Sequence, residues 1–199
     1  MNTINGLVLS GGLSSRMGSD KGLLLLNNKP WFKIAAEKLS PFCDKTFISI
    51  RKDQQPLYQA HQPFSSGMEF IFDRDELEIA GPAAGIISAH LYKPSCDWFV
   101  LSSDMLNITP GIISTAIDTR QKSSSYDACL FSPGERLEPL CGIYTAEGLE
   151  KLTEKILFTR NYSLTAHLNQ MNVSPGSLKD ISVENFKSFN TANDLDPIK

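Results

Sequence analysis

Two adjacent glycines and two cations lie in one short segment near the N-terminus, directly after an apolar run. The segment reads LSGGLSSRMGSDK from residue 9 to residue 21. Gly11 and Gly12 allow the backbone to pass close to a ligand and to adopt positive φ, and successive backbone N–H groups in such a loop can bind phosphate oxygens. Arg16 carries a forked guanidinium and Lys21 a compact ammonium. Together these groups could balance the charge of a triphosphate and of a leaving pyrophosphate.

The loop differs from two common nucleotide-binding motifs. No Gly-Lys-Ser/Thr follows the glycines, as it would in a Walker A loop, and adjacent glycines do not fit G-x-G-x-x-G. An ordinary Gly/Ser turn with two solvated cations is the competing interpretation. The order of Arg16, Gly18, Asp20 and Lys21 after a buried strand favours the phosphate loop.

The elements that must position this loop alternate between strand and helix. Short apolar runs predict strands at 6–10, 46–50, 69–73, 97–102, 127–131 and 140–145. Amphipathic patterns and early prolines predict helices at 30–39, 81–90, 110–121 and 147–157. This alternation predicts a doubly wound α/β fold, a mostly parallel sheet in a three-layer α/β/α sandwich.

The last part of the chain is less regular. Residues 172–189 fit short strands and turns without a clear period. Beyond them, Thr191 followed three residues later by Asp194 predicts a capped helical start.

Three candidate site residues follow predicted strands, and ligands bind at the carboxyl ends of strands in such sheets. Gly11, Asp73 and Asp104 should therefore face one crevice. Mg²⁺ prefers one or two carboxylates together with phosphate oxygens and water, so Asp104 alone could hold it. Alternatively, Asp104 caps the loop before Pro110 and Asp73 is a plain turn residue.

The 9–21 segment resembles the signature L-x-G-G-x-S-x-R-M-G-x-D-K of the MobA-like nucleotidyltransferases, the family of the molybdenum-cofactor guanylyltransferases. Further segments are similar to later family motifs. These segments are Asp73 with GPAAG at 81–85, Ser103 with Asp104, EPLCGIY at 138–144, and FNTANDL at 189–195. Departures from the family pattern occur at Ser10, Met105, Ser188 and Ala192.

The resemblance implies a Mg²⁺-dependent guanylyltransferase that moves GMP from GTP onto molybdopterin carrying molybdenum. It implies catalytic roles for Arg16, Lys21 and Asp104, with Mg²⁺ held by Asp104. It further suggests molybdoenzymes or other cofactor-biosynthesis proteins as partners. The residues expected to contact the nucleotide are Leu9, Ser10, Gly11, Gly12, Lys21, Asp73, Gly81, Gly85 and Asn190.

Other interpretations of the same residues stay open. The chain could use CTP or a sugar-phosphate acceptor, or it could bind nucleotide without catalysis. Asn190 could be only a helix-entry residue, and Gly81 and Gly85 could serve only tight packing between strand and helix. Trp31 and Trp98 lie in apolar contexts, so we expect both in the core.

Composition sets the remaining limits. The 199 residues predict a single domain over 1–199, with an NTP-binding half at 1–110 and an acceptor-side half at 111–199. A net charge of −3 does not favour a nucleic-acid partner. The four cysteines form no CxxC pair, and no stretch approaches the ~20 apolar residues of a membrane span. The first residues lack a signal-peptide pattern, so we expect a cytoplasmic protein with no membrane contact.

Overall fold

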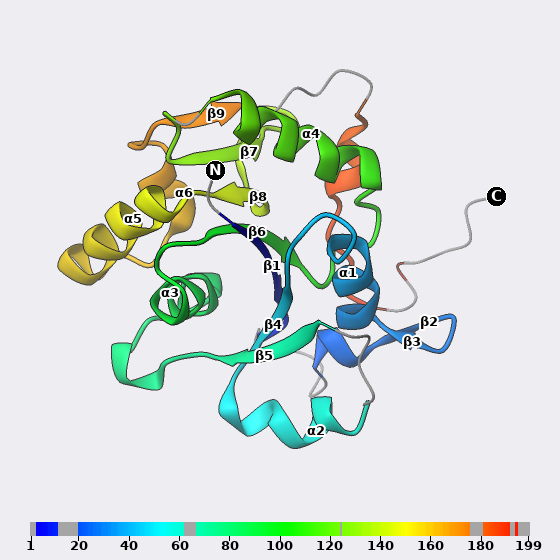
Figure 1. Cartoon of the computed structure of the whole chain (residues 1–199). Coiled ribbons are helices and arrows are strands. Elements are labelled where there is room, and N and C mark those ends of the chain that lie inside the picture. Colours follow the sequence, from blue (N-terminus) through cyan, green and yellow to red (C-terminus); the bar gives the residue numbers. More distant parts are fainter. Residues whose placement is uncertain are drawn as a thin grey trace.

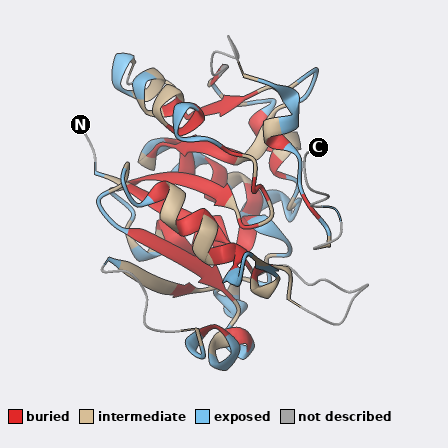
Figure 2. Cartoon of the chain, turned by 90° about the vertical axis from the view of Figure 1, so that its right-hand side faces the viewer, coloured by how far each residue is buried: buried red, intermediate tan, exposed pale blue. Residues whose placement is uncertain are grey.

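The computed structural model describes residues 3–11, 20–61, 67–123, 125–175, 181–191 and 194. A seven-stranded sheet forms the middle layer, and helices cover both of its faces (Figure 1). Buried residues concentrate in the central strands and on the inner sides of the helices (Figure 2). The predicted three-layer α/β/α architecture is therefore confirmed.

The sheet is parallel except at one strand. Its order is β5-β4-β1-β6-β8-β7-β9, and β8 runs antiparallel to both of its neighbours. The strands are β1 (Ile4–Leu9), β4 (Thr46–Ile50), β5 (Met68–Phe72), β6 (Asp97–Ser102), β7 (Ala128–Phe131), β8 (Glu138–Tyr144) and β9 (Val173–Pro175). Strand β1 lies between β4, the next strand of the main sheet, and β6, which follows later. Such a reversal of strand order opens a crevice at the carboxyl ends, where ligands bind.

The two faces of the sheet carry separate helices. Helices α1 (Trp31–Leu39) and α4 (Pro110–Lys122) pack on one face, and α3 (Pro82–Tyr92), α5 (Ala146–Thr159) and α6 (Leu164–Leu168) pack on the other (Figure 1). Strand β1 supplies both cores, because successive side chains point to opposite faces. Val8 joins the core under α1 and α4, whereas Leu7 and Leu9 join the core under α3 and α5.

A short helix, a hairpin and 3₁₀ turns lie outside the main sheet and its covering helices. Helix α2 (Gln55–Gln59) follows β4, and β2 (Leu25–Leu26) pairs with β3 (Lys29–Pro30) in a hairpin before α1. Single 3₁₀ turns occur at η1 (Lys21–Leu23), η2 (Lys52–Gln54), η3 (Asp75–Leu77) and η4 (Val183–Phe186). In the described part of the chain, no helix has the length and apolarity that a membrane crossing requires.

Most predicted elements agree with the structure. The strands predicted at 46–50 and 97–102 have the observed bounds of β4 and β6, and all the main predicted helices form. The hairpin, α2 and α6 were not predicted, because their runs are too short to show a period. Trp31 and Trp98 are fully buried, as expected.

The predicted cap near the C-terminus also forms. Thr191 Oγ1 accepts a hydrogen bond from the backbone N–H of Asp194 at 3.3 Å, and Asp194 Oδ2 accepts one from the backbone N–H of Thr191 at 2.8 Å. This reciprocal pair fixes the segment that carries Asn190.

Candidate active site

A pocket of about 600 Å³ opens at the carboxyl ends of β1, β4, β5 and β6. Eight predicted site residues line it: Leu9, Ser10, Gly11, Lys21, Asp73, Gly81, Gly85 and Asp104. Asn190 is not part of the lining but contacts Lys21. Gly12 and Arg16 lie outside the described residues. The topology thus brings together residues that lie far apart in the sequence.

Lys21 connects the loop to the residue that follows β6. Its Nζ donates a hydrogen bond to Asn190 Oδ1 at 2.7 Å and lies 3.5 Å from Asp104 Oδ2. Ser102 Oγ donates to the other carboxylate oxygen of Asp104 at 2.6 Å. The backbone N–H of Phe189 donates to the Asp104 carbonyl at 3.0 Å, which holds the C-terminal segment beside this cluster.

The oxygens around Lys21 suit a hard cation. Asp104 Oδ2 and Asn190 Oδ1 both face one ammonium, so their lone pairs converge on the same positive charge. A carboxylate and an amide oxygen are ligands that Mg²⁺ accepts, with phosphate oxygens and water completing the shell. The described residues contain no cluster of three or more His, Cys, Asp or Glu side chains that could hold a metal by themselves. The donor set therefore fits a metal that arrives with a phosphate ligand.

Asp73 lies against the first glycine of the loop. Ser49 Oγ donates to Asp73 Oδ1 at 2.8 Å, and a Cβ on Gly11 would lie 3.2 Å from Asp73 Oδ2. Burial raises the pKa of Asp73, against the opposing effects of the Ser49 hydrogen bond and the Arg51 charge. The carboxylate is thus held at the pocket wall in a partly dehydrated setting.

Gly11 does not adopt the positive φ that a glycine allows. The glycines with positive φ among the described residues are Gly67, Gly81, Gly134 and Gly142. What Gly11 provides is close approach, because its missing side chain makes room for the Asp73 carboxylate.

Gly81 and Gly85 serve different needs. Gly81 precedes α3 with φ 71° and ψ −159°, a conformation that other residues rarely adopt. Gly85 lies inside α3, where a Cβ would approach Ser49 Oγ to 2.3 Å. The packing interpretation is therefore supported for Gly85, although both glycines also line the pocket.

Several lining residues were missed in the sequence: Ser49, Arg51, Arg74, Asp75 and Ser102. Arg51 follows β4 directly, as Asp73 follows β5. The rule that identified Asp73 would have found it.

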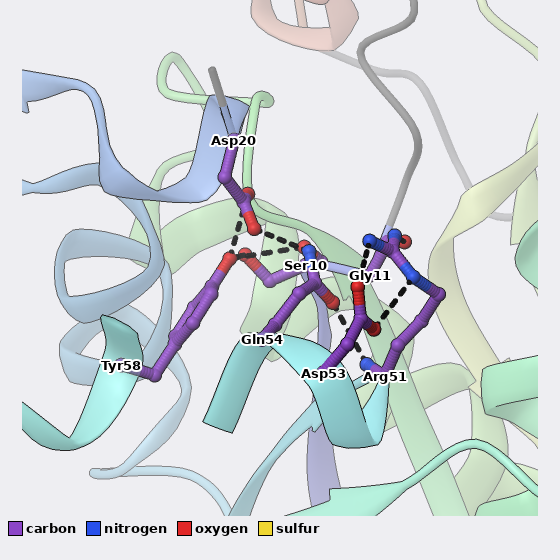
Figure 3. A network of polar contacts seen from close by, with 7 residues as sticks. All are labelled: Ser10, Gly11, Asp20, Arg51, Asp53, Gln54 and Tyr58. Carbon is purple, nitrogen blue, oxygen red and sulfur yellow. Dashed lines mark hydrogen bonds and ion pairs between the residues drawn. The ribbon is translucent and has the colours of Figure 1, made fainter. Parts of the chain in front are cut away.

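Arg51 bridges the loop and the β4–α2 connection. Its Nη1 donates to the Gly11 carbonyl at 2.6 Å, while Nε and Nη2 donate to the two carboxylate oxygens of Asp53, each at 3.0 Å. Figure 3 shows this part of the network beside a second part built on Asp20, Gln54, Tyr58 and Ser10. A guanidinium at the pocket wall adds positive charge to a site suited to phosphate.

Comparison with known proteins agrees with this geometry. The MobA-like NTP transferase domain model matches residues 6–171. A probable molybdenum cofactor guanylyltransferase from Geobacillus sp. is 29% identical over all of this chain and 99% of that protein. A molybdenum cofactor biosynthesis bifunctional protein from Synechocystis sp. is 28% identical over 81% of this chain, which spans 43% of that longer protein.

A solved structure has the same fold. Molybdopterin-guanine dinucleotide biosynthesis protein A from Archaeoglobus fulgidus superposes with a TM-score of 0.75 at 24% identity, covering 96% of this chain and 94% of that one. The family match covers the strands and the loop that build the pocket. The chain is thus a nucleotidyltransferase and belongs to the MobA-like NTP transferase family.

Proposed function

We propose that this chain transfers GMP from GTP to molybdopterin carrying molybdenum, with Mg²⁺, and releases pyrophosphate. The observation that carries the proposal is the Asp104–Lys21–Asn190 cluster, of which Lys21 and Asp104 line the pocket beside the glycine loop. It combines a cation for phosphate with oxygens for a metal. The name of the Geobacillus relative supports guanylyl transfer, and the names of both relatives support an acceptor from the synthesis of the molybdenum cofactor.

The triphosphate would lie along the glycine loop. Backbone N–H groups from Gly11 onward, the Lys21 ammonium and the Arg16 guanidinium would bind its oxygens. Ser10 and Leu9 would support the loop, and Asp73, Gly81 and Gly85 would border the nucleoside. These roles make the parallel side of the sheet, within residues 1–110, the nucleotide-binding half. Apart from Asn190, which contacts Lys21, they leave residues 111–199 for the acceptor.

The reaction is a single displacement at phosphorus. A terminal phosphate oxygen of the acceptor attacks the α-phosphorus of GTP, and the bond from that phosphorus to the bridging oxygen of the β-phosphate breaks. That bridging oxygen keeps the bonding electron pair and leaves as part of pyrophosphate. No protein nucleophile is required, so the protein contributes positioning and charge stabilisation.

The residues divide this work. Lys21 stabilises the negative charge that grows on the leaving pyrophosphate. Asp104 would hold Mg²⁺, and Asn190 would offer a second oxygen beside it. Bound there, the ion would supply Lewis-acid catalysis and would help to position the phosphates. We place the activity in the cytoplasm, with molybdoenzymes or other cofactor-biosynthesis proteins receiving the product.

A thermal-shift panel tests the nucleotide assignment. GTP, CTP, ATP and UTP are each added with and without Mg²⁺. We expect GTP with Mg²⁺ to give the largest stabilisation, about 2.7 kcal/mol at 100 times its Kd. A larger shift with CTP would move the chain to a cytidylyltransferase role, and no shift with any nucleotide would overturn the proposal.

A further inference from the structure

The two ends of the phosphate loop meet at one buried tyrosine. The Tyr58 hydroxyl lies 2.7 Å from Ser10 Oγ and 3.0 Å from the Ser10 carbonyl oxygen, at the start of the loop. It also donates to Asp20 Oδ1 at 2.8 Å, at the end of the loop. Tyr58 is fully buried in α2, outside the 9–21 segment. The proposed mechanism uses neither Tyr58 nor its neighbour Gln54.

Gln54 completes the grip on Asp20. Its side-chain oxygen accepts the backbone N–H of Arg51 at 2.8 Å, which turns its amide nitrogen toward Asp20. That nitrogen then donates to Asp20 Oδ2. Figure 3 shows Asp20 above Ser10, with Tyr58 on one side and Gln54 below. Both carboxylate oxygens of Asp20 are therefore held by residues of the η2–α2 segment.

The hydrogen bonds that hold Asp20 also constrain the backbone of Lys21. Asp20 caps the turn η1, in which Lys21 is the first residue, and its Oδ1 accepts the backbone N–H of Gly22 at 3.1 Å. Gly22 packs so closely that a Cβ would approach Ser10 Oγ to 1.8 Å and Tyr58 Oη to 2.5 Å. The backbone of Lys21 is thus fixed at one end, while its ammonium reaches Asn190 and Asp104 at the other.

We propose that Tyr58 and Gln54 are positioning residues, which hold Asp20 and Ser10 together and thereby set the place of Lys21 against the phosphates. We call Ser10, Asp20, Gln54 and Tyr58 the polar clamp. The inference rests on the proposed function, because it takes Lys21 to act on the leaving pyrophosphate. A misplacement near 1 Å can cost about a hundredfold in rate, so a remote hydroxyl can matter to the reaction.

If the Tyr58 hydroxyl had only a structural role, its removal would lower the stability of the fold without a specific loss of kcat. Loss of a buried hydrogen bond lowers stability wherever the bond is located. Tyr144 provides the matched case: it is also fully buried, and its hydroxyl donates to the Pro139 carbonyl at 2.7 Å. Tyr58→Phe and Tyr144→Phe can therefore be compared as two tyrosines that each lose one buried hydroxyl.

The experiment measures pyrophosphate release and backbone amide exchange in the full chain with Mg²⁺, GTP and acceptor. We expect Tyr58→Phe to lower kcat about tenfold or more with KM changed less than about threefold, and Tyr144→Phe to change kcat less than about threefold. Exchange at the Gly22 amide should quicken in Tyr58→Phe without nucleotide, while the amides of β6 keep their protection. Equal kcat in the two variants, with unchanged exchange at Gly22, would overturn the clamp.

A double-mutant cycle sharpens the test. Asp20→Asn removes the charge that Tyr58 and Gln54 hold, so Tyr58→Phe should add little to it in kcat. Additive losses would mean that the two residues act independently and would contradict the clamp. If the wild-type chain releases no pyrophosphate with acceptor present, the proposed function fails, and the exchange at Gly22 still decides whether the clamp holds Asp20.

Discussion

Strands of opposite direction border the two sides of the pocket. On the parallel side, β1, β4, β5 and β6 end there, and the residues directly after them carry the polar groups of the site. On the antiparallel side, β8 begins there instead. Among the described residues that line the pocket, Leu140 alone comes from β8. The polar groups that line the pocket are concentrated at the carboxyl ends, and the antiparallel strand contributes one apolar side chain to the lining.

The contrast separates two tasks. The parallel side has charged groups held in place by hydrogen bonds: the Asp73 carboxylate accepts one from Ser49, and the Arg51 guanidinium donates three. Such preorganised groups suit phosphates and a metal, because the reaction requires these to lie at defined positions. An apolar side chain such as Leu140 suits the flat ring system of the proposed acceptor, molybdopterin. Variants on the two sides should therefore affect different kinetic constants.

The largest effect should come from Asp104→Asn. This change keeps the side-chain shape but removes the negative charge expected to hold Mg²⁺, so pyrophosphate release should fall about a hundredfold or more while GTP still binds. Steady-state release at several Mg²⁺ and Mn²⁺ concentrations, paired with isothermal titration of GTP, measures both. Asp44→Asn, an exposed position before β4, is the control. Normal turnover with unchanged Mg²⁺ dependence would make Asp104 only a loop cap.

Lys21→Ala should rank second. The Lys21 side chain is 31% exposed, so its loss leaves no core cavity and the fold should survive. We expect pyrophosphate release to fall about ten- to hundredfold, with weaker GTP binding, because a phosphate contact is lost. Circular dichroism and release assays are run together, with Lys45→Ala, which loses an exposed ion pair to Glu69, as the control. Near-normal release in a folded variant would remove Lys21 from the site.

Asp73→Asn should separate stability from binding. Because burial raises the pKa of Asp73 in the folded chain, ionisation disfavours folding once the pH rises above the unfolded value of 3.8. The free energy of unfolding of the variant, relative to that of the wild type, should therefore be higher at pH 7 than at pH 4. GTP affinity should fall about tenfold. Urea unfolding at both pH values and GTP titration measure this. A stability difference that does not change with pH would contradict the account of the buried carboxylate.

The smallest effect should come from Leu140→Ala on the antiparallel side. GTP affinity should change less than about threefold, because the residue offers no polar contact, while the KM for the acceptor rises. Acceptor titration at saturating GTP measures it. A loss of GTP affinity as large as that of Asp73→Asn would erase the distinction between the two sides.

Much of the parallel side could be predicted from the sequence. Apolar runs such as TFISI at 46–50 and DWFVLS at 97–102 identify buried strands. Residues that closely follow such strands, such as Asp104 after 97–102, must then lie at one edge of the sheet. The family resemblance added Asn190, which the strand pattern alone would not connect to Lys21 across 169 positions.

The remainder depends on packing that local patterns do not encode. Neither the reversed direction of β8 nor the grip of Tyr58 on Asp20 leaves a period or motif in the sequence. The need for glycine at position 22 is likewise evident only in the structure, where Ser10 Oγ occupies the space that a side chain would need. The direction of a strand and the partners of a side chain depend on the assembled sheet, whereas the residues that form a strand can be recognised from the local sequence.

GMP transfer by this site can be tested directly by following label from GTP. GTP labelled at the α- or at the γ-phosphate is incubated with the chain, Mg²⁺ and molybdenum-loaded molybdopterin. We expect the α-label to join the acceptor and the γ-label to leave in pyrophosphate, and both events to require the acceptor. Transfer of γ-label to the acceptor, or tight GTP binding without acceptor-dependent release of pyrophosphate, would contradict GMP transfer by this site.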